Sequence, residues 1–134
     1  MEKVIVEIYF TGKNFCAYAP ILTGCVSTAS TLKGIKANIK EAIEFHIETS
    51  KEFNDPIPEI FRGNYELVFV VSTEALLNAY SNIFTKAALS RITGINERQL
   101  WHYASGMRKP RPAQRKRIEE GLHRLGDELI NINV

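Results

Sequence analysis

Residues 85–112, TKAALSRITGINERQLWHYASGMRKPRP, contain two short helical patterns separated by a glycine. Thr85 can cap a first helix over residues 86–93, because its hydroxyl can accept a hydrogen bond from a free N–H in the first turn. Gly94 ends this helix, since glycine readily adopts the left-handed backbone conformation that reverses the chain. The spacing therefore predicts a helix, a sharp turn and a second helix.

The second helix is expected from Glu97 to about Ala104, with Asn96 as its N-terminal cap. Leu100 and Tyr103 are three residues apart and can reach the same core as Ile95 in the turn. A helix pair of this kind, followed by a basic loop with two prolines, is typical of a DNA-binding helix-turn-helix.

The charge distribution points to the same half of the chain. The formal net charge is +2 for the 134 residues. Residues 1–72 carry seven Lys and Arg against nine Asp and Glu, which gives −2, and residues 73–134 carry ten against six, which gives +4. Within residues 85–117, nine basic residues accompany a single acid, Glu97. A basic block of this kind indicates nucleic-acid binding, and a solvated basic face is the alternative.

The remaining elements of the second half complete an all-α domain over residues 73–134. A helix over residues 74–80 is expected to follow a cap at Thr73 or Ser72 and to turn Leu76, Leu77 and Tyr80 inward. A last helix over residues 113–130 carries an apolar stripe. Its members are Ile118, Leu122, Leu125 and Leu129, and it is interrupted by Gly121 and Gly126.

This segment resembles the Cro/repressor type of helix-turn-helix. That type often has a helix of small residues, a glycine turn, a second helix and a Gly-basic-Pro loop. The residues at those places are Thr85-Lys86, Leu89-Ser90, Gly94-Ile95-Asn96, Leu100, Tyr103, Gly106 and Arg108-Lys109-Pro110. The resemblance implies that the second helix enters the major groove of double-stranded operator DNA.

The polar residues of the second helix are the predicted base readers. Arg98 can bond a guanine through two N–H groups, and Gln99 can bond an adenine in the same way. His102 follows Arg98 by one turn, and Asn96 stands at the start of the helix. Trp101 is expected either to cover a sugar or a thymine methyl group or to pack in the core.

Further basic residues are candidates for phosphate contacts, which position a protein on DNA without reading its sequence. These candidates are Lys86, Arg108, Lys109 and Arg111. Arg115, Lys116 and Arg117 are expected to be a solvated start to the last helix. Because one small helix-turn-helix rarely gives sufficient affinity, a homo-oligomer, dimer or tetramer, is also expected.

The first half predicts an α+β module over residues 1–72. Alternating and β-branched residues indicate strands at 3–10, 15–19, 25–28 and 65–72, and Ser30 can cap a helix over residues 31–49. An apolar stripe on that helix is formed by Leu32, Ile35, Ile39, Ile43 and Ile47. The order is β-β-β-α-β, with an antiparallel meander first, a proline-containing loop over residues 51–64, and one sheet face covered by the helix.

Residues 15–46 resemble the core of the HicB antitoxin domain. The features that carry the resemblance are Phe15, Tyr18, Pro20, Leu22, Gly24-Cys25, Thr31-Leu32 and the run Asn38-Ile39-Lys40-Glu41-Ala42-Ile43. The resemblance implies a truncated ribonuclease-H-like fold for roughly residues 3–72. It also implies that this module binds a small RNA-cleaving toxin of the HicA type and has no catalytic activity.

Several other classes of function are not expected from the sequence. Glu7 and Glu66 lack the acidic neighbours that a metal cage requires, and no Ser/His/Asp or Cys/His arrangement is visible. Cys16 and Cys25 are interpreted as small buried hydrophobes rather than a disulfide or metal pair. We expect no enzyme, metal or cofactor. No run is apolar enough for a membrane span and no leader is recognised, so a cytoplasmic protein is expected.

The two resemblances together imply an antitoxin that neutralises a cognate toxin and represses transcription from its own operator. The main alternative is a solitary helix-turn-helix regulator whose N-terminal module only dimerises or senses a ligand. A metal-dependent nuclease is a more remote alternative.

Overall fold

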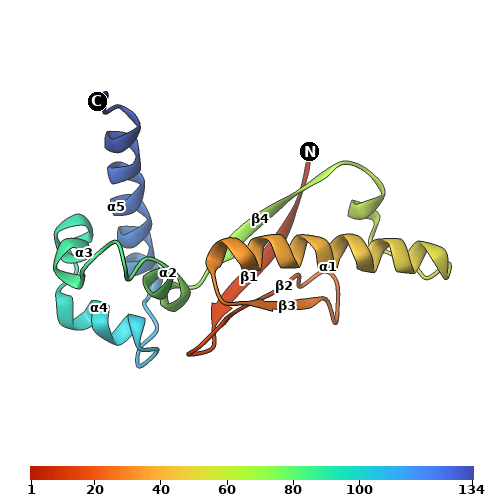
Figure 1. Ribbon diagram of the computed structural model, residues 1–134, viewed down its shortest axis with the longest axis horizontal. Helices are drawn as coiled ribbons and strands as arrows, with labels where there is room; N and C mark the ends of the chain where they lie inside the picture. Colours follow the sequence, from red (N-terminus) through yellow and green to blue (C-terminus); the bar gives the residue numbers. More distant parts are fainter. The chain divides into compact units, whose positions relative to one another are not determined.

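The computed structural model describes residues 1–134 and contains a four-stranded mixed sheet and five α-helices. The fold is therefore of the mixed α+β kind (Figure 1). The chain forms two compact units, Met1–Ala75 and Leu76–Val134. Our expected boundary, between residues 72 and 73, is at the start of α2 (Thr73–Ala79), whereas the units separate inside that helix.

The sheet of the first unit has the strand order β3-β2-β1-β4. β1 (Glu2–Phe10), β2 (Phe15–Tyr18) and β3 (Val26–Ala29) form the expected antiparallel meander. β4 (Tyr65–Val71) is parallel to β1, with Val4 opposite Leu67 and Val6 opposite Phe69. A parallel neighbour requires a crossover connection, and α1 lies within that connection.

One face of this sheet is covered by α1 (Leu32–Glu52), as the isoleucine stripe predicts (Figure 1). All four stripe isoleucines are buried. The expected cap was wrong by one residue, because Thr31 is extended and its hydroxyl accepts from the N–H of Gly34 at 2.9 Å. The segment expected to be a loop contains a short 3₁₀ helix, η1 (Glu59–Arg62).

The other face of the sheet has no helix over it within this unit. Because side chains alternate along a strand, Val4, Val6 and Ile8 of β1 are buried while Ile5 between them is 44% exposed. Tyr9 continues the open face and stacks on Tyr18 of β2, with ring centroids 5.9 Å apart. Val26 and Val70 are also exposed on their strands. This open face therefore exposes several apolar side chains, with Glu7 between Tyr18 and Val70.

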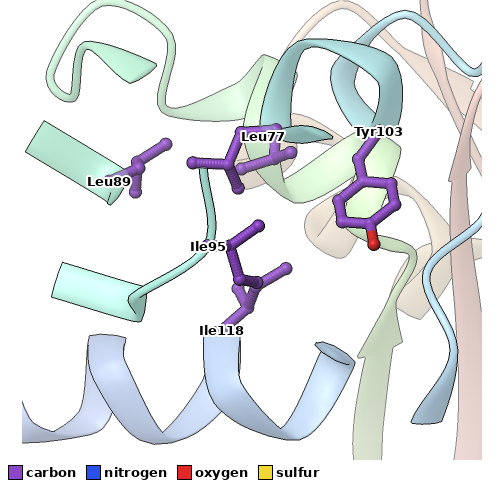
Figure 2. Close-up of a cluster of buried hydrophobic side chains, with 6 residues drawn as sticks. Leu77, Leu89, Ile95, Tyr103 and Ile118 are labelled. Atoms are coloured by element: carbon purple, nitrogen blue, oxygen red, sulfur yellow. The ribbon is translucent and has the colours of Figure 1, made fainter. Parts of the chain in front are cut away.

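The second unit is all-α and is built around one apolar cluster. Its longer helices are α3 (Lys86–Thr93), α4 (Glu97–Ala104) and α5 (Pro112–Ile130). Figure 2 shows side chains of the cluster turned toward one another. The buried members are Leu77, Leu89, Ile95, Leu100, Tyr103 and Ile118. Tyr80 and Leu129, expected inward, are 40% and 55% exposed and lie outside this cluster.

The turn between α3 and α4 has the predicted local structure. The Thr85 hydroxyl accepts from the Ala88 N–H at 3.0 Å, and the side-chain oxygen Oδ1 of Asn96 accepts from the Gln99 N–H at 2.8 Å. Gly94 has φ 76°, in the left-handed region. Both caps and the glycine turn are confirmed. None of the helices of the chain is both long and apolar enough to cross a membrane.

Candidate nucleic-acid interface

The two faces of α4 have different roles because successive residues are rotated by about 100° around a helix. Leu100 and Tyr103 are 0% and 2% exposed, and they fix the inner face against the apolar cluster. Arg98, Trp101 and His102 project on the opposite side by the same geometry. We call these three residues the outer face of α4.

Arg98 is the basic residue of the outer face and stands in the first turn of α4. It is exposed, and its guanidinium makes no hydrogen bond or ion pair within the chain. A guanidinium that has no partner within the chain keeps all its N–H groups available to a ligand. Of the predicted base readers, Arg98 is therefore the one most clearly available.

Gln99 is off the outer face. It is half-buried, and its amide nitrogen Nε2 donates to the hydroxyl of Tyr103 at 2.9 Å. This bond directs the amide toward the basic loop rather than toward the side occupied by Arg98. The sequence places Gln99 and Tyr103 four residues apart on one helix, but whether the amide bonds this hydroxyl or stays free for DNA depends on how the Tyr103 ring packs in the core.

His102 is the residue of the outer face nearest the C-terminal end of α4. Its ring atom Nδ1 is buried without a hydrogen-bond partner, the only such side-chain nitrogen or oxygen in the chain. The residue is half-buried, so Nε2 is the ring nitrogen that remains accessible. A contact from His102 to a ligand would therefore be made through Nε2. The backbone carbonyl of the same residue accepts from the Arg108 N–H at 3.2 Å.

Trp101 and Lys86 form a pair across the two helices. Trp101 is 60% exposed, which excludes the core-packing alternative for this residue. Lys86 is only 8% exposed, and its Nζ lies 4.5 Å from the centre of the Trp101 ring. The predicted phosphate residue is thus held against an aromatic side chain instead of extending freely into solvent.

The basic loop, residues 105–111, borders a polar hollow of about 510 Å³. Gly106 has φ 78°, and the loop returns to α4 through the bond between Arg108 and His102. Arg108, Lys109 and Arg111 are exposed. The hollow is lined by Gln99, Tyr103, Arg108, Lys109, Arg111 and Gln114. With three cations and no carboxylate, this hollow suits an anionic ligand such as a phosphate.

Three further predicted residues have structural contacts. The side chain of Asn96 is engaged in its cap and so serves the start of α4. Arg117, expected to be solvated, is exposed but donates from Nη2 to the carbonyl of Gly94 at 2.8 Å. Arg115 donates to the carbonyl of Pro110 at 3.1 Å. The first two turns of α5 therefore contact both the Gly94 turn and the basic loop.

The first unit brings together Cys25, His46 and Asp55 at the rim of an open hollow of about 510 Å³. Cys25 is 5% exposed, and burial raises the pKa of its thiol. A raised pKa keeps the thiol protonated near neutral pH, which is the opposite of an activated nucleophile. No group of three or more His, Cys, Asp and Glu side chains is placed to hold a metal ion.

No protein-family model matches the chain, and no curated protein or solved structure matches it either.

Proposed function

We propose that residues 73–134 form a helix-turn-helix that binds double-stranded operator DNA, with α4 as the recognition helix. The observation that carries the proposal is the exposed, unpaired guanidinium of Arg98 on the side of α4 opposite Leu100 and Tyr103. A recognition helix presents its N-terminal side chains to the major groove. Arg98 stands where such a helix would read a base.

In this DNA-binding site, some residues would contact bases and others would contact backbone phosphates. Arg98 would bond O6 and N7 of a guanine, and His102 would reach the same groove through Nε2. Arg108, Lys109 and Arg111 would contact backbone phosphates, which fix the register of the protein on the duplex. Asn96 and Gln99 would support these residues from the cap and from the bond to Tyr103.

We further propose that the first unit is a truncated ribonuclease-H-like module that binds a small toxin of the HicA type. The HicB resemblance suggests this role, and the open sheet face with Ile5, Tyr9, Val26 and Val70 supports it. Exposed apolar side chains gathered on one face commonly mark a protein contact, and here Glu7 lies among them, between Tyr18 and Val70. The chain would then be a cytoplasmic antitoxin and autorepressor, acting as a homo-oligomer and by binding rather than catalysis.

The two parts of the proposal require separate experiments. A gel-shift titration of the chain's own promoter fragment tests DNA binding, and we expect a shift that weakens steeply with added salt. The absence of any salt-sensitive shift would overturn the helix-turn-helix proposal. Co-expression with the neighbouring small reading frame tests the antitoxin role. We expect a small basic protein to copurify and its RNA cleavage to be suppressed, whereas a solitary regulator would bind DNA without such a partner.

A further inference from the structure

Lys86 is an unusual lysine because it is buried without an acidic partner. Its exposed fraction is 8%, and it makes no ion pair and no hydrogen bond within the chain. Lysines are almost never so buried unless they are paired. Its ammonium lies over the ring of Trp101, with Nζ 4.5 Å from the ring centre.

Trp101 has no core role that would account for its position. It is 60% exposed and stands on the outer face of α4, one helix away from the lysine that it contacts. A cation over an indole face is attracted by the ring quadrupole. The ring therefore restricts a long side chain that would otherwise move freely at the start of α3.

No carboxylate pairs with Lys86 at the start of α3. Lys86 is the first residue of α3, whose first turn contains no acid. Thr85 satisfies the N–H of Ala88, but the N–H groups of Lys86 and Ala87 have no acceptor in the chain. Free N–H groups at a helix start favour an anion.

An open hollow of about 500 Å³ adjoins this helix start. Its lining contains no carboxylate, and it combines both residues of the pair with hydroxyl and amide groups. The lining includes Asn78, Ser81, Thr85, Lys86, Trp101 and Ser105. The Lys86 ammonium and the start of α3 thus adjoin one space that lacks a carboxylate, which favours an anion there. Asn78, Ser81 and Ser105 already donate to backbone carbonyls, so the ammonium and the helix start are the groups left to bind it.

We propose that Trp101 is a positioning residue. It holds the Lys86 ammonium at the start of α3, where the two form a preformed binding site for one phosphate of the DNA backbone. This inference rests on the proposed DNA-binding function. It gives Trp101 a role in affinity that is independent of base sequence, because the ring acts on DNA through Lys86. A preformed cation loses less side-chain freedom on binding than a mobile surface lysine.

The salt dependence of DNA binding tests this phosphate-binding site. The dissociation constants of the promoter duplex and a scrambled duplex of equal length are measured over a range of salt for the wild type, Lys86→Met, Trp101→Ala and Trp101→Phe. Losing one phosphate contact lowers the slope of log K against log salt by about 1. We expect that change in Lys86→Met and Trp101→Ala, with both duplexes weakened by the same factor. Trp101→Phe keeps an aromatic face and should retain most of the wild-type slope.

The double variant Lys86→Met/Trp101→Ala separates positioning from an independent contact. If Trp101 acts through Lys86, the double variant binds both duplexes no more weakly than Lys86→Met alone. A Trp101→Ala protein with an unchanged salt slope, or with a changed preference between the duplexes, would overturn the inference but leave the proposed function intact. A wild-type protein that binds neither duplex would overturn both.

Trp101 is the only tryptophan in the chain, so its fluorescence gives a second readout. Titration with the scrambled duplex should change the emission of the wild type and change that of Lys86→Met much less. An equal response in the two proteins would indicate a direct contact of the indole with DNA. It would contradict the proposal that Trp101 acts through Lys86.

Discussion

A β-carbon on Gly121 of α5 would lie 2.7 Å from the backbone carbonyl oxygen of Ile92 in α3. Real β-carbons essentially never approach a backbone atom so closely. The same carbonyl accepts a hydrogen bond from Nη2 of Arg124 at 3.3 Å. The close approach of α5 to α3 therefore depends on the absence of a side chain at residue 121.

We predict that Gly121→Ala destabilises the second unit. Alanine is favoured over glycine inside a helix by roughly 1 kcal/mol, but here the methyl group must displace backbone, and overpacking costs about 1–3 kcal/mol. Urea unfolding should therefore give a lower free energy of unfolding. Gly126→Ala is the matched control, because nothing lies within 4 Å of its added β-carbon, and it should stabilise by roughly 0.5–1 kcal/mol. A stabilised Gly121→Ala protein would contradict the packing described.

Thr93 gives a second prediction about stability. Its buried hydroxyl donates to the carbonyl of Leu89 at 2.7 Å and accepts from the Ile95 N–H at 3.2 Å. Thr93→Val keeps the shape but leaves that N–H unpaired, which costs about 1–3 kcal/mol. Thr93→Ser keeps the hydroxyl and serves as the control. Equal free energies of unfolding for Thr93→Val and the wild type would show that the hydroxyl does not support the turn.

Arg98→Ala tests the base-reading assignment. We expect the free energy of promoter binding to weaken by about 1–3 kcal/mol and the preference at one base position to relax. Fluorescence anisotropy with a set of single-base variants of the duplex measures both effects. Arg62→Ala, which removes an exposed charge from the first unit, should leave both unchanged. Unaltered promoter affinity in Arg98→Ala would remove this residue from the site.

The two cysteines are predicted to differ in reactivity. Burial leaves Cys25 5% exposed and raises the pKa of its thiol, so the thiolate fraction at a given pH is smaller than for a free cysteine. In a Cys16→Ser variant, alkylation near neutral pH should be slow, should accelerate as the pH rises, and should become fast in denaturant. Labelling of the native variant as fast as that of the unfolded chain would show that Cys25 is accessible.

Local patterns were sufficient for much of the second unit. Thr85, Gly94 and Asn96 predicted the ends of α3 and α4, because caps and glycine turns are satisfied by neighbouring residues. The isoleucine stripe of α1 likewise predicted which face of the helix is buried. The Ser30 cap failed, because two adjacent hydroxyl residues are equivalent in sequence and only the backbone conformation at Thr31 selects one of them.

The sequence by itself determined the helix pair, its caps, its apolar residues and the basic block around it, because each follows from chemistry within a few residues. The tertiary structure decided what the functional candidates contact. Gln99 meets Tyr103, Lys86 is confined by Trp101, Arg117 bonds the carbonyl of Gly94, and Gly121 lies against Ile92. Two of these contacts join different helices, one joins α5 to the Gly94 turn and one lies within α4, and all four depend on how the side chains and helices pack. Periodicity and spacing contain no information about that packing.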